Sequence, residues 1–279
     1  MTPAERRRAI LDLLETRGEV SVEELARLFR VSQVTIRNDL SDLEARGLAQ
    51  RTYGGAVPAR KALYNPSFEE KQRHRLEAKQ AIAQRALIHI QEGDTLILDA
   101  GSTTLVLARL LKHRFTRLFV LTNSIPVALE LQGSGLEVLV LGGSMRHHSL
   151  ALIGPATVRT LSWYRADKAF LGATGVDLRG YSTPNPLEAE TKRAMLEAAG
   201  RAYVLADASK LGRSTLARFA ALREATLITD RMASPEELRA YKAQGAEVEV
   251  ADLSMTLEGH TASKAPLGLG KTQEVDHEG

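Results

Sequence analysis

Residues 95–111, TLILDAGSTTLVLARLL, contain a short apolar run, a polar turn and a longer apolar stretch with helical spacing. A short apolar run bounded by turn residues is typical of a buried strand, and the stretch after it predicts a helix over 104–112. Further helices are predicted at 124–132, 187–199 and 234–244. The same alternation predicts seven strands, which are Thr95–Asp99, Leu118–Thr122, Glu137–Leu141, Lys168–Leu171, Ala202–Ala206, Thr226–Thr229 and Glu247–Val250. This alternation indicates an α/β domain, a mostly parallel sheet flanked by helices on both faces.

Polar loops follow four of these strands, at the sheet edge where open α/β sheets bind ligands. Gly101 permits close approach of the backbone to a ligand, and the amides and hydroxyls that open the next helix can hold a phosphate. Glycine, serine and threonine are also ordinary turn and capping residues, so one such loop is weak evidence for a ligand site. Four such loops after four strands favour a shared polar crevice. The candidate residues are Asp99, Gly101, Ser102, Thr103, Thr104, Thr122, Asn123, Ser124, Gly142 and Gly143, and residues 171–175 form the fourth loop.

Two lysines offer the charge that a phosphate requires. Lys210 lies just after a predicted strand, which places it within reach of the crevice. Lys192 lies on a predicted helix, where a solvated lysine is the more ordinary interpretation. Asp99 and Asp207 end strands, and they either bind sugar hydroxyls or cap the following segments.

The N-terminal residues predict three short helices and a hairpin. Thr2 with Glu5, and Ser21 with Glu24, form capping boxes, and Ser32 caps the third helix. Two short helices joined by a tight turn have helix-turn-helix form.

The third helix carries the residues predicted to contact DNA. Val34, Ile36 and Leu40 are expected to face inward, and the polar positions between them to project into a major groove. Any three-helix bundle shows polar residues on its outer face, so the caps, the spacing and the hairpin together carry the prediction. The predicted contacts are Ser32, Gln33, Thr35, Arg37 and Asn38 on this helix, and Arg51 and Tyr53 on the hairpin, which would form a wing.

Composition sets the remaining limits. The chain has 279 residues, 44% of them hydrophobic and 25% charged, and its net charge of +3 does not by itself call for nucleic acid. No run reaches the roughly 18 apolar residues of a membrane helix, and there are no cysteines, so we expect a soluble, cytoplasmic protein without disulfides. Gly268–Thr272 echoes a Walker A loop but follows no strand, and His147–His148 lacks a third metal ligand. We predict no metal and no cofactor.

These features divide the chain into four expected parts. Residues 3–57 are a winged helix-turn-helix domain, 58–75 a linker, 76–252 the α/β domain, and 258–279 a tail without periodicity that is predicted to be disordered.

The N-terminal segment resembles the DNA-binding domain of the DeoR family of bacterial transcription regulators, in Ser32–Leu40 (SQVTIRNDL) and in RTYGGA at 51–56. The strings ILDAGSTTLVLARLL, VLTNSIPVALEL, VLGGSMR, ADKAFLGATGVD, STPNPLEAETKRAM and LADASKLGR resemble the family's C-terminal domain, which is similar in fold to ribose-5-phosphate isomerase. The resemblance implies that the strand-end loops, with Lys192 and Lys210, bind a phosphorylated sugar. It therefore implies a repressor of a carbohydrate operon.

The hypothesis has three versions. In the first, a homodimer or homotetramer binds operator DNA and a phosphosugar changes its affinity. In the second, the protein is a phosphosugar isomerase fused to a DNA-binding domain, with Glu188, Glu190 and Lys192 as acid and base. In the third, the protein is a purely architectural DNA-binding protein, which would not need the polar loops at the strand ends. The first is the favoured version, and it is not an enzyme.

Overall fold

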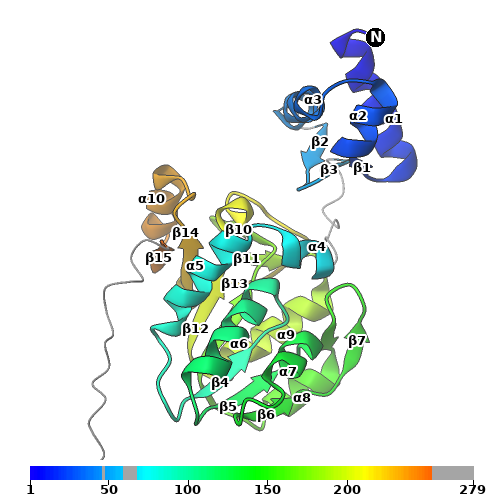
Figure 1. The fold of residues 1–279 in the computed structure, drawn as a ribbon. Helices are drawn as coiled ribbons and strands as arrows, with labels where there is room; N and C mark the ends of the chain where they lie inside the picture. The colour runs from blue at the N-terminus through cyan, green and yellow to red at the C-terminus, as the bar shows by residue number, and fades with distance from the viewer. Residues whose placement is uncertain (46–47, 59–67, 253–279) are drawn as a thin grey trace, which may run out of the picture.

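The computed structural model describes residues 1–45, 48–58 and 68–252. Residues 46–47, residues 59–67 of the expected linker and the expected tail at 258–279 lie outside the described residues. Two units are visible in Figure 1, a helix-turn-helix unit (residues 2–58) and an α/β unit (residues 68–252). In the described ranges, no helix is long and apolar enough to span a membrane.

The helix-turn-helix unit contains α1 (Pro3–Arg17), α2 (Val22–Phe29) and α3 (Gln33–Ala45). A small antiparallel sheet of order β1-β3-β2 adjoins them, with β1 at Val20–Ser21, β2 at Ala49–Arg51 and β3 at Gly55–Pro58. The predicted capping residues are confirmed, because the side chains of Thr2, Ser21 and Ser32 accept hydrogen bonds from the amides of Glu5, Glu24 and Thr35. The pairing of β1 with β3 was not predicted. It requires glycine at position 55, where a Cβ would lie 1.6 Å from the carbonyl oxygen of Val20.

The predicted inward position of Val34 is wrong, since its side chain is 61% exposed. Ile36 and Leu40 are fully buried one turn apart, as i and i+4 positions should be. Val34 precedes Ile36 by two residues, roughly 200° around the helix, and so it lies on the opposite face.

The α/β unit is built on a seven-stranded parallel sheet of order β15-β14-β12-β9-β4-β5-β6. All seven predicted strands are present within three residues of their expected ends, which confirms the fold class. Their bounds are β4 Thr95–Leu98, β5 Phe119–Thr122, β6 Glu137–Val140, β9 Ala166–Gly172, β12 Ala199–Leu205, β14 Thr226–Asp230 and β15 Val248–Ala251.

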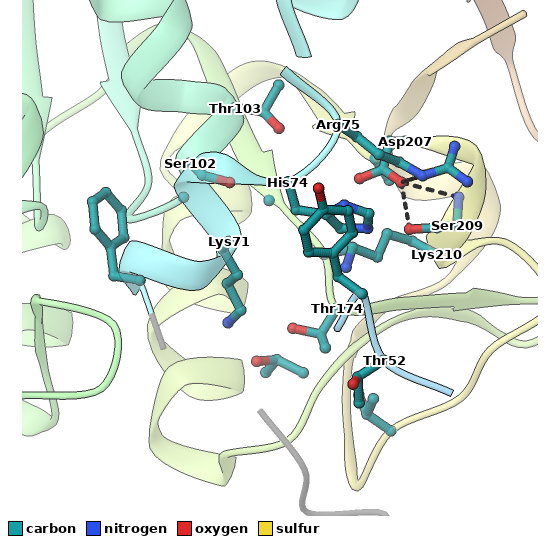
Figure 2. A pocket seen from close by; sticks show the side chains of 18 of the residues that line it. Thr52, Lys71, His74, Arg75, Ser102, Thr103, Thr174, Asp207, Ser209 and Lys210 are labelled. Carbon is teal, nitrogen blue, oxygen red and sulfur yellow. Dashed lines mark hydrogen bonds and ion pairs between the residues drawn. The ribbon is translucent and has the colours of Figure 1, made fainter. Parts of the chain in front are cut away.

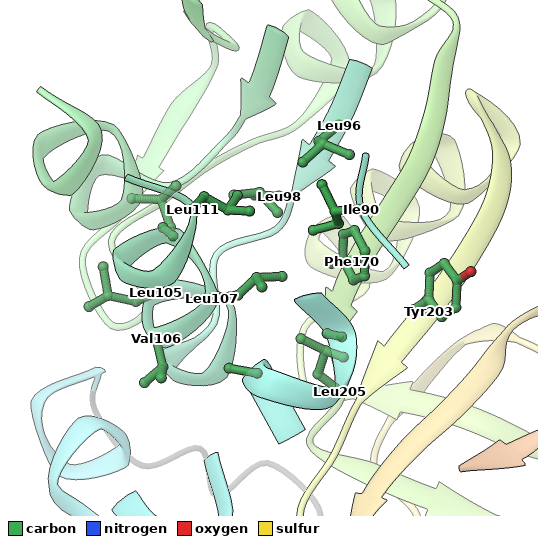
Figure 3. Close-up of a cluster of buried hydrophobic side chains, with 14 of the residues drawn as sticks. Ile90, Leu96, Leu98, Leu105, Val106, Leu107, Leu111, Phe170, Tyr203 and Leu205 are labelled. Carbon is green, nitrogen blue, oxygen red and sulfur yellow. The ribbon is translucent and has the colours of Figure 1, made fainter. Parts of the chain in front are cut away.

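Helices cover both faces of this sheet. Along β4, Leu96 and Leu98 pack into one hydrophobic cluster, with Phe170 and Leu107 (Figure 3), whereas Ile97 packs into another with Met195. This alternation is what a pleated strand imposes on a sheet that is buried on both faces. The helices are α5 Leu76–Leu87, α6 Ser102–Arg114, α7 Ile125–Leu131, α8 Pro155–Leu161, α9 Pro186–Glu197 and α10 Pro235–Ala243.

Several smaller elements were not predicted. A hairpin joins β7 (Ser144–Arg146) to β8 (Ala151–Ile153). A second antiparallel sheet has the order β10-β11-β13, with β10 at Gly175–Asp177, β11 at Gly180–Thr183 and β13 at Ala217–Ala220. Short 3₁₀ turns lie at Ala208–Lys210 and Leu222–Glu224, and residues 68–73 of the expected linker form helix α4 (Phe68–Arg73).

Candidate functional site

A cavity of about 730 Å³ lies at the carboxyl ends of the parallel strands. Its walls include the loops that follow β4, β9 and β12, and α4 with the residues after it forms another wall (Figure 2). The strand order reverses at this point. From β4 the chain adds β5 and β6 on one side, and it then returns to add β9, β12, β14 and β15 on the other side. Open α/β sheets bind ligands at such a switch point.

The first loop turns directly into α6. The Thr104 hydroxyl is fully buried, accepts a hydrogen bond of 3.0 Å from the Gly101 amide and lies 2.6 Å from the Asp99 carbonyl oxygen, to which it can donate. It therefore holds the loop in shape, whereas Ser102 and Thr103 line the cavity. The amides of a first helical turn have no partner within the helix, and the helix dipole favours an anion there.

Lys192 and Asp99 form a buried ion pair at the switch point. The Lys192 ammonium contacts Asp99 Oδ2 and donates to the carbonyl oxygen of Gly172 at 2.9 Å. Asp99 Oδ2 also accepts the Gly172 amide at 2.9 Å. The pair thus ties α9 to the loops after β4 and β9, and both residues line the cavity.

A second cluster surrounds Asp207. Its Oδ1 accepts a hydrogen bond from the amide of Ser209, and Arg75 Nε lies 3.7 Å away. Burial alone would raise the pKa of Asp207, but the charge of Lys210 and the Ser209 hydrogen bonds lower it. Burial also lowers the pKa of Lys210, although Asp207 opposes that effect.

Glu188 is fully engaged by its neighbours. Its carboxylate accepts hydrogen bonds from Ser149 (2.6 Å), Thr183 (3.0 Å) and Arg146 (3.1 Å). Burial would raise the pKa of Glu188, but the Ser149 hydrogen bond and the nearby cations lower it. The residue is therefore held as a carboxylate that organises the wall.

The charge of the α/β part of the cavity wall is unbalanced, whereas the helix-turn-helix unit adds Glu19, Glu24, Glu44 and Arg51 to the lining. In the α/β unit the described lining includes three carboxylates, Asp99, Glu188 and Asp207. Seven basic side chains line it as well, which are Lys71, Arg73, Arg75, Lys79, Lys192, Lys210 and Arg213. Two of these seven, Lys79 and Lys192, are buried, and an excess of cations on this side of the cavity suits a ligand that carries negative charge.

The structure brings seven of the predicted ligand residues to this cavity, namely Asp99, Gly101, Ser102, Thr103, Asn123, Lys192 and Lys210. The other five, Thr104, Thr122, Ser124, Gly142 and Gly143, lie outside its lining. Thr122 Oγ1 donates to the Leu98 carbonyl oxygen, and Ser124 Oγ caps α7. Gly143 has φ +146°, and a Cβ there would meet Thr157. These residues shape the loops, and ligand contact by any of the twelve stays a prediction.

The sequence interpretation missed the basic residues before α5. Lys71, Arg73, His74 and Arg75 lie in the run KQRHR at 71–75, which was assigned to the linker. Its density of charge was the available signal.

The predicted DNA-facing residues gather on one surface of α3. Gln33, Arg37 and Asn38 are exposed, and Arg37 donates to Gln33 Oε1 at 3.1 Å. Ser32 and Thr35 are joined by a hydrogen bond of 2.9 Å at the start of the helix. The buried carboxylate of Asp39 on the other side binds Arg6 and Arg7 of α1, which fixes the orientation of α3.

The remaining two predicted residues lie on or beside the wing, the hairpin of β2 and β3. Arg51 donates to Ser41 Oγ of α3 at 2.9 Å. Tyr53 is 76% exposed, and its ring centroid lies 4.4 Å from that of His74 in the α/β unit. Contact of these residues with DNA stays a prediction.

A helix-turn-helix unit with a wing, followed by an α/β unit with a basic cavity, defines a DNA-binding regulator with a sensor domain. Residues 6–61 match the model of the DeoR-like helix-turn-helix domain, and residues 74–231 match that of the DeoR C-terminal sensor domain. The chain belongs to the DeoR family, and it is a transcription regulator rather than an enzyme.

Two curated relatives and one solved structure illustrate the similarity. The chain is 41% identical to the HTH-type transcriptional regulator GlpR of Haloferax volcanii, over 82% of this chain and 91% of the relative. It is 36% identical to the lactose phosphotransferase system repressor of Streptococcus mutans, over 82% and 93%. Ribose 5-phosphate isomerase A of Methanocaldococcus jannaschii shares 20% identity, with a TM-score of 0.37 over 49% of this chain and 54% of that one.

Proposed function

We propose that this protein represses a carbohydrate operon and that a phosphorylated sugar bound in the cavity controls its affinity for operator DNA. The observation that carries the proposal is the excess of basic side chains that the α/β unit places around a cavity bordered by the first turn of α6. A phosphate monoester carries a charge of about −1.5 to −2 at neutral pH, which that excess would neutralise.

The same cavity offers partners for a sugar. Asp207 accepts hydrogen bonds, and Ser102, Thr103 and Asn123 add hydroxyl and amide groups to the wall. The side-chain oxygen of Asn123 is buried and has no hydrogen-bond partner in the described part of the chain, so it can accept one from a ligand hydroxyl. The repressor name of the Streptococcus mutans relative refers to lactose, which agrees with a carbohydrate ligand.

DNA binding is assigned to α3 and the wing. Arg37 and Asn38 are exposed on the helix that a helix-turn-helix places in the major groove. Asparagine pairs best with adenine, so Asn38 favours an adenine in the operator. Helix-turn-helix proteins bind paired half-sites as dimers, and we therefore propose a homodimer or homotetramer that acts in the cytoplasm.

A binding screen tests the ligand part of the proposal. Thermal unfolding of the purified protein is followed with hexose 6-phosphates, fructose 1-phosphate and glycerol 3-phosphate, each beside its unphosphorylated counterpart. A ligand that binds the folded state at a hundredfold excess over its Kd adds about 2.7 kcal/mol to the stability. A shift with one phosphorylated compound, absent for its counterpart, supports the proposal, and no shift with any compound contradicts it.

A charge substitution locates the phosphate. Ser102→Asp places a carboxylate at the first turn of α6 and should abolish the shift. Ser234→Asp is the matched control, because Ser234 begins α10, which does not border the cavity. A normal shift in the Ser102 variant would place the phosphate elsewhere.

None of the three residues that the isomerase alternative requires is placed as a base. The Glu188 carboxylate is occupied by three hydrogen bonds, Glu190 is exposed and does not line the cavity, and Lys192 is paired with Asp99. Proton abstraction requires a base with its proton acceptor directed at the substrate.

A further inference from the structure

The segment Phe68–Arg75, called the strap below, lines the ligand cavity together with residues 50–54 of the wing. Its first residue is fixed to the α/β unit, because the Phe68 side chain is buried in the hydrophobic core and its amide donates to the His148 carbonyl oxygen at 3.0 Å. Its last residue, Arg75, directly precedes α5, and its carbonyl oxygen accepts a hydrogen bond of 3.1 Å from the Lys79 amide. Both ends of the strap are therefore attached to the α/β unit, and the segment between them borders the cavity (Figure 2).

Three basic side chains of the strap, Lys71, Arg73 and Arg75, line the cavity, and two of them face its charged groups. Arg75 approaches Asp207, and Lys71 faces the charges of Glu188, Lys192, Lys210 and Arg146. Burial lowers the pKa of Lys71 to about 7, although Glu188 opposes that effect. An anion in the cavity would add negative charge beside these cations and attract the Lys71 ammonium.

Lys79 of α5 holds the strap through hydrogen bonds to its backbone. This side chain is 4% exposed, and its ammonium donates to the carbonyl oxygens of Lys71 and His74. Any shift of the strap must exchange these bonds for others, because a buried ammonium without partners is strongly unfavourable. Such an element favours two discrete positions over a continuous range.

His74 connects the strap to the wing. Its ring packs against Tyr53 with an interplanar angle of 40°. Its Nδ1 is buried and has no hydrogen-bond partner among the residues that the structure describes. The ring packs directly on the wing, so a shift of the strap would change its contact with Tyr53.

We propose that the strap transmits ligand binding to the DNA-reading unit, with Lys71 and Arg75 contacting the anionic group and His74 moving against Tyr53 of the wing. This inference rests on the proposed function. The ligand changes DNA affinity only to the extent that it favours one position of the strap over the other. An allosteric coupling of about 1–3 kcal/mol corresponds to roughly 5- to 150-fold.

The chain contains no cysteine, so a pair of introduced thiols reports this contact alone. The variant Tyr53→Cys/His74→Cys is treated with dibromobimane, which becomes strongly fluorescent when it joins two thiols. The rate of cross-linking is measured without ligand, with each compound of the phosphosugar screen, and with inorganic phosphate. The two single variants report the reactivity of each thiol. Tyr53→Cys/Ser162→Cys is the distance control, because Ser162 ends α8, far from the wing (Figure 1).

We expect efficient cross-linking of the Tyr53/His74 pair without ligand, and a change of at least about fivefold with the compound that raises the melting temperature. No cross-linking beyond the distance control would overturn the inference. If the ligand raises the melting temperature but leaves the cross-linking rate unchanged, the proposed role of the strap is wrong and the proposed ligand stands. Absence of both responses overturns the proposed ligand and the strap together.

A second variant tests the strap as a ligand contact. Lys71→Met removes the charge and retains an apolar stem of similar length, and it should reduce the phosphosugar affinity by at least tenfold. Lys242→Met, on the exposed face of α10, is the matched control and should bind normally. Equal affinity in the two variants would show that the strap does not contact the ligand.

Discussion

The two units of this protein both present basic side chains to a candidate site, and those on the DNA-facing surface of α3 are exposed whereas two of those beside the cavity are buried. Arg37 is exposed on α3, whereas Lys192 and Lys79 are 7% and 4% exposed beside the cavity. Exposed charges are screened by salt and cost little when they lose a partner. Buried charges require partners at all times. The difference suits a surface that must release a long polyanion, and a cavity that must discriminate among small anions.

The largest expected effect comes from breaking the buried Asp99–Lys192 pair. Lys192→Met leaves an uncompensated carboxylate and should lower the free energy of unfolding by about 3–5 kcal/mol, measured by urea denaturation. The exposed Glu23–Arg27 pair of α2 is the control, and Arg27→Met should cost less than about 1 kcal/mol. The double variant Asp99→Asn/Lys192→Met should recover most of the loss. A similar loss of stability in Lys192→Met and Arg27→Met would show that the buried pair and the exposed pair do not differ.

The next effect concerns DNA. Arg37→Ala should weaken operator binding by about 1–3 kcal/mol if the guanidinium contacts a base edge, measured by fluorescence anisotropy. Phosphosugar binding should be unchanged, and Arg239→Ala on α10 should leave both affinities unchanged. DNA affinity should also fall steeply with salt, as it does when phosphate contacts release counterions. Unaltered operator affinity in the Arg37 variant would refute the assignment of α3.

A pH titration probes the buried side of the comparison. Lys71 has a pKa of about 7 without ligand, and a bound anion raises it, so binding takes up a proton. Phosphosugar affinity should therefore fall as pH rises above 7, by at most about tenfold per unit. Lys71→Met should flatten that slope, measured by calorimetry from pH 7 to 9. The stability of the ligand-free fold depends on pH in the opposite direction. The pKa of Lys71 is about 7 in the folded protein and 10.5 ordinarily, so the unfolded chain binds more protons between these values, and the free energy of unfolding rises with pH there.

The smallest effect tests a residue that pattern alone misplaced. Val34→Ala should change the free energy of unfolding by less than about 0.5 kcal/mol, because the side chain is exposed. Ile36→Ala, two residues along, should cost about 2–5 kcal/mol, since Ile36 is fully buried. A comparable loss of stability in the two variants would show that the Val34 side chain is buried.

The strands were predictable because each is a short apolar run that both faces of a parallel sheet bury. The approximate place of the cavity was predictable too, since strand ends align in such a sheet and bring Asp99 near Lys192 and Lys210. The choice among neighbouring hydroxyls was not predictable from sequence. Ser102 borders the cavity and Thr104 does not, because side-chain direction depends on where α6 begins. The strap was missed because its basic run also suits a solvated linker, and only tertiary packing brings it to the cavity.

The switch point between β4 and β9 has a consequence for how the ligand preference of such a protein can change. Asp99 and Gly172 are hydrogen-bonded although they lie 73 residues apart in the chain. The α6 side of the cavity is thus encoded early, and the loops after β9 and β12 are encoded late. A single recombination event within the intervening gene segment would join the α6 side of one family member's cavity to the loops after β9 and β12 of another. New ligand combinations are in this way open to exchange of whole segments, without stepwise substitution of the cavity wall.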